Sequence, residues 1–315
     1  MNVRHLGLGL ILMFSSSANA AKMTVSETKC PFQDDGVRVY KLTSDNKIGG
    51  FDSDLASYSS GDQFRHFAIS TCYNNLFSVY GKDIGLTIKE NDIQVIDNAI
   101  KKATRDLNDP KNPTVWERYA IANAIYGALN ASSYKRANLL LEASWTVRDS
   151  IVGFHRGLNG PEAVKNLLEI APGEIKKDLQ PEQRKLLLYN LARVAHRGGY
   201  IQWRNHYLNL FKSLPNLSAE DKRSATYFER LSTKVEPDLQ RQALSLFKKS
   251  LSEKEPIGHR ERALYLIADL NRRLGNHNEA MKGYKSISMS TTDKNLKMLS
   301  EFFIKNDLRM KPKRK

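Results

Sequence analysis

Two cysteines are the residues of this chain best suited to nucleophilic or metal chemistry. Cys30 begins the run Cys-Pro-Phe-Gln, and Cys72 begins Cys-Tyr-Asn-Asn. A zinc ribbon needs four ligands, usually two Cys-x-x-Cys pairs, because Zn²⁺ is held tetrahedrally by thiolates. Gln33 and Asn75 stand where the second cysteine of each pair would be. Neither thiol has a nearby base motif, so we predict no cysteine nucleophile.

The histidines and carboxylates show no spacing that indicates catalysis. The seven histidines are scattered and form no His-Glu-x-x-His or related metal pattern. Asp52-Ser53-Asp54 could start a calcium loop, but Ala56 and Ser57 stand where an EF-hand needs a further ligand and a glycine. We therefore expect the two aspartates to cap a turn. The sequence predicts no catalytic residue, no metal site and no cofactor. Two carboxylates that only folding brings together could still form a glycosidase-like pair, because sequence spacing does not show such a pair.

Aromatic and basic side chains on the expected helices are the candidates for a binding surface. Each could line a concave groove or join the core. His196 lies beside Arg197 and near Arg193, and we expect these three on one exposed helix face. The candidate groove residues are Trp116, Tyr126, Trp145, Arg193, Arg197, Trp203 and Tyr207.

Helices are expected to position these residues, and residues 262–287 show the pattern best. Leu264, Ile267, Ala268 and Asn271 share one helical face, and Gly275 ends that helix. A second helix then places apolar side chains on a common face, with small residues where the two backbones approach. This spacing resembles one unit of a tetratricopeptide repeat, except that Asn271 replaces an aromatic residue.

The same spacing occurs once more in the chain. The earlier match lies about 76 residues upstream, roughly twice a helix-hairpin period, and ends at Gly199 as the later one ends at Gly275. We predict about four degenerate helical hairpins over residues 92–310, with further helices at 116–129, 134–150, 224–232 and 239–251 and a turn at 234–237. An irregular helix bundle is the alternative.

Residues 21–91 differ from the rest in composition, because they hold both cysteines and a Gly-, Ser- and Asp-rich centre. Alternating runs at 37–42 and 65–72 indicate strands with one buried face, and Gly49-Gly50 suits the turn between strands. We expect a small β-rich module here, so the fold class is mainly α with a β-rich N-terminal part.

The N-terminal segment of the chain predicts export. Met1–Ala20 has a short basic start, an apolar run and Ala18-Asn19-Ala20, which predicts a signal peptide cleaved between Ala20 and Ala21. The apolar run is too short to span a bilayer. The net charge is 49 − 34 = +15. In an exported protein this excess favours acidic proteins or anionic envelope polymers over nucleic acid. Residues 311–315 form a basic tail, expected to be disordered.

The cysteine module and the helices together resemble a bacterial domain-of-unknown-function family. That family combines Cys-Pro-x-Cys and Cys-x-x-Cys knuckles around a G-x-D-x-D/L segment with tetratricopeptide-like helices. The runs LNRRLG (270–275) and LLLEASWTVRD (139–149) are similar to its helical half. The resemblance implies this fold and a binding role, without a known activity.

Each knuckle keeps one cysteine, which makes the family's zinc site doubtful here. Facing knuckles in an exported protein imply a Cys30–Cys72 disulfide, with two free thiols or a residual metal site as alternatives. We therefore expect a periplasmic or secreted, non-enzymatic scaffold that binds an unknown protein or peptide in a helical groove. A cell-envelope enzyme or cell-wall-polymer-binding protein is the alternative.

Overall fold

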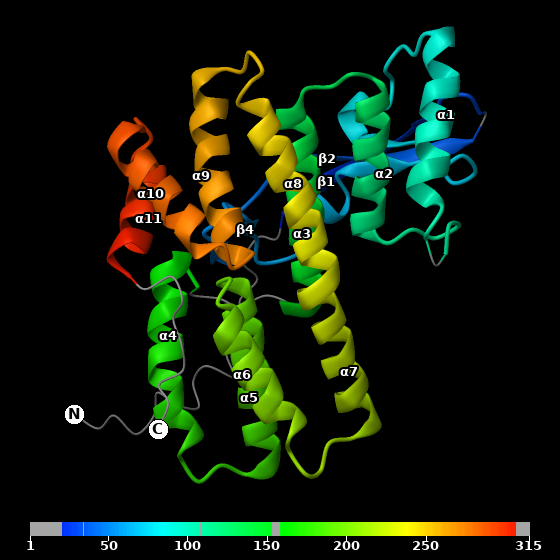
Figure 1. The fold of residues 1–315 in the computed structure, drawn as a ribbon. Helices are drawn as coiled ribbons and strands as arrows, with labels where there is room; N and C mark the ends of the chain where they lie inside the picture. Colours follow the sequence, from blue (N-terminus) through cyan, green and yellow to red (C-terminus); the bar gives the residue numbers. More distant parts are fainter. Residues whose placement is uncertain (1–20, 34, 108, 153–157, 307–315) are drawn as a thin grey trace.

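The computed structural model describes residues 21–33, 35–107, 109–152 and 158–306 of the protein. Short antiparallel strand pairs come first and helices follow, so the fold is mainly α with a small β-rich N-terminal part (Figure 1). The predicted signal peptide and the basic tail lie outside the described residues. The strands are β1 (Lys22–Lys29), β2 (Gly36–Ser44), β3 (Gly50–Phe51), β4 (Ser57–Tyr58), β5 (Ile69–Thr71) and β6 (Ser78–Tyr80). The helices are α1 (Glu90–Thr104), α2 (Val115–Ala128), α3 (Ser133–Val152), α4 (Gly160–Ile175), α5 (Pro181–Arg197), α6 (Ile201–Lys212), α7 (Ala219–Arg230), α8 (Glu236–Ser250), α9 (Ile257–Arg273), α10 (His277–Ser290) and α11 (Lys294–Lys305).

The strands pair β1 with β2, β3 with β4 and β5 with β6. The strand predicted at 37–42 lies within β2, which pairs with β1. The strand predicted at 65–72 is wrong in its first half, because Phe64–His66 forms a 3₁₀ turn. This turn brings Arg65 to Asp149 of α3, with Nη2 and Oδ1 2.7 Å apart. The contact of Arg65 with helix α3, and not pairing with another strand, therefore determines the backbone conformation at Phe64–His66.

Cys30 and Cys72 form a disulfide, as expected, and both are buried. The bond joins the end of β1 to the end of β5, across 42 residues of sequence. A closed loop of this length contributes about 4 kcal/mol in the chain-entropy model. The disulfide thus stabilises a part of the chain whose strands are too short to form a large core.

The helices pack mostly as antiparallel neighbours along the chain. The two helices predicted at 262–287 are α9 and α10, and Gly275 between them has φ +84°, a conformation that glycine adopts without strain. Among the described helices none is both long and apolar enough to cross a membrane. In Figure 1, α5 and α6 lie below α9, and the C-terminal ends of α5 and α9 meet in the middle of the molecule.

The turn predicted at 234–237 is wrong, because α7 runs into α8 through a π-helical turn at Leu231–Val235. A proline inside a helix removes one N–H donor. The wider turn accommodates Pro237: the N–H of Glu236 reaches back to the carbonyl of Leu231, and the helix continues.

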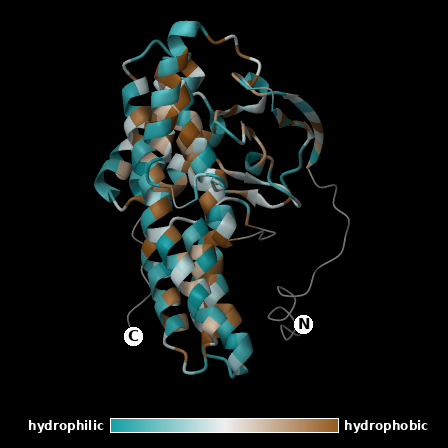
Figure 2. Ribbon diagram, turned by 90° about the vertical axis from the view of Figure 1, so that its right-hand side faces the viewer, coloured by the Kyte–Doolittle hydropathy of each residue, from teal (hydrophilic) through white to brown (hydrophobic). Residues whose placement is uncertain are grey.

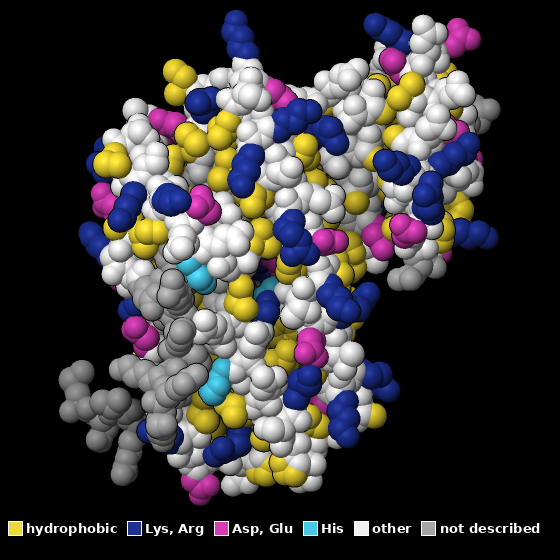
Figure 3. Space-filling model, in the orientation of Figure 1, with side chains coloured by type: hydrophobic (Ala, Val, Ile, Leu, Met, Phe, Trp, Pro, Cys, Tyr) yellow, Lys and Arg dark blue, Asp and Glu magenta, His cyan; other side chains and the backbone are white. Residues whose placement is uncertain are grey.

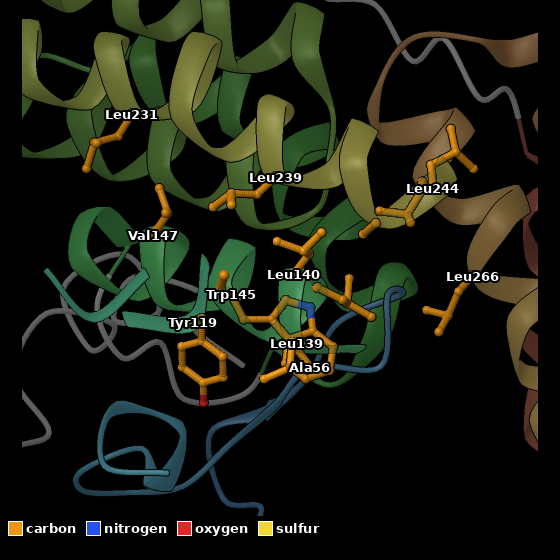
Figure 4. Packing of buried hydrophobic residues seen from close by; sticks show 14 of the residues in the cluster. Ala56, Tyr119, Leu139, Leu140, Trp145, Val147, Leu231, Leu239, Leu244 and Leu266 are labelled. Carbon is orange, nitrogen blue, oxygen red and sulfur yellow. The ribbon is translucent and has the colours of Figure 1, made fainter. Parts of the chain in front are cut away.

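The core runs along the contact between α3 and α8. Leu139 and Leu140 of α3, Leu239 and Leu244 of α8 and Ala56 of the N-terminal part all belong to this core (Figure 4). Figure 2 shows that polar residues lie largely on the outer sides of the helices. The N-terminal part and the helices therefore share one continuous core.

Candidate functional site

Most of the candidate groove residues lie inside the protein. Trp116 and Arg193 are only partly buried. The rest, Tyr126, Trp145, Arg197, Trp203 and Tyr207, are each less than a tenth exposed. They line no open groove, because neighbouring helices and the N-terminal part cover them.

The exposed helix face expected for His196 and Arg197 is a wrong prediction. Arg197 is fully buried and His196 is 7% exposed. Both lie at the C-terminal end of α5, where the N-terminal part and α8 supply carboxylates. A buried cation is tolerated when such partners surround it.

Residues 50–58, which we call the acidic loop, supply two of these carboxylates. The loop is a tight hairpin in which the N–H of Asp52 donates to the carbonyl of Ala56 at 2.8 Å. Asp52 and Asp54, which were expected to cap a turn, lie in this hairpin but are at most 3% exposed, and their carboxylates accept from side chains of α3 and α5. Gly50 starts the loop at φ +84°, and a Cβ added there would lie 2.2 Å from the carbonyl oxygen of Leu158.

Arg148 of α3 is the central cation of the site. Its guanidinium donates to Asp54 Oδ2 at 2.6 Å, to Asp52 Oδ2 at 2.9 Å and to Glu236 Oε1 at 2.8 Å. Trp145, one turn earlier on α3, donates its indole N–H to Asp54 Oδ2 at 3.1 Å. One face of α3 therefore binds the acidic loop on one side and α8 on the other.

Arg197 of α5 binds the other side of the loop. Its Nε donates to Asp52 Oδ1 at 2.7 Å, and its Nη2 donates to the carbonyl of Gly49 at 2.9 Å. The guanidinium also lies over the ring of Tyr58, 3.9 Å from the centroid. Two groove candidates, Trp145 and Arg197, thus do contact a peptide segment, but that segment belongs to their own chain.

Helix α9 completes the site with Asp269, Arg272 and Arg273. Asp269 accepts from Arg272 Nε at 3.0 Å and from Arg273 Nε at 2.9 Å. Arg272 Nη2 donates to Ser53 Oγ of the acidic loop at 2.7 Å. Arg273 Nη1 donates to the carbonyl of Arg197 at 3.1 Å, at the end of α5. The arginines of α9 therefore bind free carbonyls at the C-terminal end of another helix, where cations are favoured.

The two helix ends that meet here are the two copies of the internal sequence match. Gly199 and Gly275 both have positive φ, +72° and +84°. After each glycine, the next N–H reaches back five residues, from Tyr200 to Ala195 and from Asn276 to Asn271, at 2.8 Å in both cases. The match at an offset of 76 thus marks two equivalent helix ends.

We call Asp52, Asp54, Arg148, Arg197, Glu236, Asp269, Arg272 and Arg273 the ion-pair cluster. It contains four guanidinium groups and four carboxylates, all at most 6% exposed. Burial alone would raise the pKa of Asp54, but the charges of Arg148 and Arg273 outweigh burial and hold it well below its usual range. At Glu236, burial alone would likewise raise the pKa of the carboxyl group, but Arg148 and His196 outweigh burial and lower this pKa to about 2. The lowered pKa values of Asp54 and Glu236 favour their ionised forms, and the formal charges of the four guanidinium groups and four carboxylates cancel.

A polar cavity of about 220 Å³ borders the cluster at Glu236. Glu236 Oε2 lies 2.7 Å from His196 Nε2, without the alignment of a hydrogen bond. Burial lowers the pKa of His196 more than the Glu236 charge raises it, which favours a neutral ring. Figure 3 shows one face of the molecule, in the orientation of Figure 1, on which Lys and Arg side chains are spread widely. The cavity lies between the ends of α5 and α9, the start of α6 and the π-helical turn.

Arg204 of α6 lines the cavity and binds the π-helical turn. Because Pro237 has no N–H and the N–H of Glu236 bonds to Leu231, the carbonyl of Ser232 needs another donor. Arg204 Nη1 supplies it at 2.9 Å. The π-helical turn therefore explains why a guanidinium lies at this wall.

The ion-pair cluster is better suited to stabilising the fold than to catalysing a reaction. The carboxylates of Asp52, Asp54 and Asp269 are buried and bound by guanidinium groups, so a substrate does not reach them. Among the described residues, no group of three or more His, Cys, Asp or Glu side chains is placed to hold a metal ion. The cavity with His196, Glu236 and Arg204 is the part of the site that a small molecule could enter.

Comparison with known proteins gives one partial match. Residues 214–306 match a family described as an uncharacterized protein conserved in bacteria, DUF2225. No curated protein and no solved structure matches the chain. The matched segment spans α7 to α11 and carries Glu236, Asp269, Arg272 and Arg273, but not the acidic loop. Over this segment the protein is similar to a bacterial family whose function is not defined.

Proposed function

We propose that this protein is an exported, non-enzymatic interaction protein whose tetratricopeptide-like helical hairpins bind a segment of another protein. The signal-like sequence at Met1–Ala20 and the Cys30–Cys72 disulfide support export, because disulfides persist in oxidising compartments. The helical hairpins support a scaffold. Their inner surface already holds one extended segment, the acidic loop, so an external partner needs a different surface.

An open apolar groove between α5, α6 and α7 carries this proposal. It has a volume of about 320 Å³ and is lined by Leu186, Tyr189 and Phe211. Leu186 is 43% exposed, although it lies beside the buried Phe211. Lys185 and Asp221 stand at the rim and bind each other at 3.2 Å. An apolar floor with a charged rim is the anatomy of a protein-binding surface.

The partner expected here is a protein segment with an apolar side chain as its anchor. A short groove suits one or two large side chains, which then carry most of the binding energy. The net charge of +15 favours a partner whose surroundings are acidic, because opposite charges speed association.

Site-specific photo-crosslinking tests the groove. A photoreactive phenylalanine derivative at Leu186 is expected to trap one reproducible protein in cells, whereas the same group at Met289, which is 82% exposed on α10, traps none. The trapped protein, once purified, should bind Leu186→Asp at least tenfold more weakly than the wild type and bind Met289→Asp unchanged. Absence of a trapped protein, or equal binding to all three proteins, would contradict the proposal.

A cell-envelope enzyme or polymer-binding protein is the second candidate, and the His196–Glu236 pair at the cavity wall favours it. A neutral histidine beside a carboxylate is a common general base. Incubation with purified peptidoglycan separates the candidates: salt-resistant co-sedimentation, or cleavage that is lost in His196→Gln, would favour the second. Neither is expected if the protein acts as a scaffold for another protein.

A further inference from the structure

The cavity wall holds a buried cation that has no matching anion. Arg204 is 7% exposed. Its Nε and Nη2 donate to Asn205 Oδ1 at 3.0 and 2.9 Å, and its Nη1 donates to the carbonyl of Ser232 at 2.9 Å. Within the described residues, no carboxylate oxygen lies within 4.0 Å of its guanidinium nitrogens. Both acceptors of Arg204 are therefore neutral amide oxygens.

The other buried arginines are different. Arg148, Arg197, Arg272 and Arg273 each contact at least one carboxylate at 3.0 Å or less. Their four charges are cancelled by the four carboxylates of the ion-pair cluster, so none of those carboxylates is left over for Arg204. A buried charge without a partner strongly destabilises the folded state. Burial lowers the pKa of Arg204, and the more distant Glu236 and Glu229 only partly oppose this effect.

The cavity has room for an anion that would pair with Arg204. Arg204 faces a space of about 220 Å³, enough for roughly seven waters or a small organic anion. Ser232, Thr233 and Gln240 add hydroxyl and amide groups to the wall, and Arg241 stands at its edge. A guanidinium has five N–H donors, of which the hydrogen bonds of Arg204 to Asn205 and Ser232 use three. Two donors are thus left for the paired oxygens of a carboxylate or phosphate.

We propose that this cavity is a binding site for a small oxyanion, a carboxylate or a phosphate, held by Arg204 at the π-helical turn. The carboxylate of Glu236 on the same wall does not repel the ligand strongly, because Arg148 binds it at 2.8 Å. The site is separate from the groove at Leu186 and does not depend on protein binding there. Occupation of the site links α6 to the junction of α7 and α8, so the ligand is expected to stabilise the folded protein.

Titration of the purified full-length protein tests the proposal with three probes: inorganic phosphate, acetate and succinate, each at constant ionic strength with chloride as the reference. At least one probe is expected to bind saturably in calorimetry with one site per chain and to raise Tm. The comparison of phosphate with the two carboxylates identifies the ligand class. If none of the three binds saturably, the proposal is wrong.

Two variants locate the site. Arg204→Gln keeps hydrogen-bond donors but removes the charge, and it should weaken anion binding at least tenfold. Thr233→Glu, at an exposed position on the cavity wall, supplies a competing carboxylate and should abolish anion binding while raising the Tm of the anion-free protein. Thr226→Glu, an exposed threonine on α7 outside the cavity lining, is the matched control and should bind like the wild type. Unchanged binding in Thr233→Glu would overturn the proposal even if Arg204→Gln does not fold.

Discussion

Glu236 shows how strongly single residues depend on the ion-pair cluster. Its carboxylate accepts from Arg148 and from Gln240, and it contacts His196, all within 3.0 Å. Such a group favours the folded state only while it is ionised. Its pKa is about 2 in the folded protein against 4.5 for a free side chain. The folded-state pKa is depressed, so its contribution is complete above pH 4.5 and is lost as the pH falls toward 2.

Glu236→Gln is therefore expected to destabilise the protein mainly at neutral pH. The shift corresponds to a contribution on the order of 3 kcal/mol, since one pKa unit is about 1.4 kcal/mol, and the variant also leaves Arg148 with one counter-charge fewer. Urea unfolding of both proteins measures the difference in unfolding free energy. It should be constant above pH 4.5 and shrink below it.

Glu220→Gln, at an exposed position on α7, is the control, and its effect should be small at every pH. A Glu236→Gln difference that does not change between neutral pH and pH 3 would show that Glu236 is not ionised in the folded protein.

At the scale of elements, the acidic loop depends on a close backbone approach that glycine alone permits. Gly50 has φ +84°, and an added Cβ would lie 2.2 Å from the carbonyl oxygen of Leu158. Gly50→Ala is expected to lower the unfolding free energy by about 2–4 kcal/mol, because strain and a steric clash add. Urea unfolding compares it with Gly36→Ala, whose Cβ would lie 4.0 Å from its nearest neighbour, the carbonyl oxygen of Thr28. Equal effects of the two substitutions would show that the loop does not need this approach.

The elements that depend on residues close in sequence could be predicted from the sequence. The glycine that ends α9 and the alternation in β2 depend on neighbours a few residues away, and both were predicted. The predicted turn at 234–237 failed because a proline usually ends a helix, whereas here a π-helical turn and a donor from Arg204 compensate for it. That donor comes from another helix, 28 residues away, which local reasoning does not include.

The ion-pair cluster escaped prediction because its partners are far apart in sequence. Arg197 and Asp52 are separated by 145 residues. One signal was present: Arg148 follows a largely apolar run in α3, where a charged residue indicates a buried partner. Another was the match at an offset of 76, which aligns Arg197 with Arg273. Periodicity identified the helices but gave no sign that their ends meet.

At the scale of the whole molecule, the disulfide and the proposed export belong together. The bond joins the strands on which the N-terminal part depends, and it persists only in an oxidising compartment. The native protein from an envelope fraction should therefore have a mass that lacks Met1–Ala20. That mass should increase by two hydrogens on reduction.

Removal of the Cys30–Cys72 disulfide is expected to lower the unfolding free energy. A Cys30→Ser, Cys72→Ser double variant should lose about 4 kcal/mol of unfolding free energy, or less if the unfolded chain keeps structure. Wild type measured in reductant is the matched control, because it removes the same cross-link without a substitution. A full-length native species with free thiols would contradict export, and the charge of +15 would then favour a nucleic-acid partner.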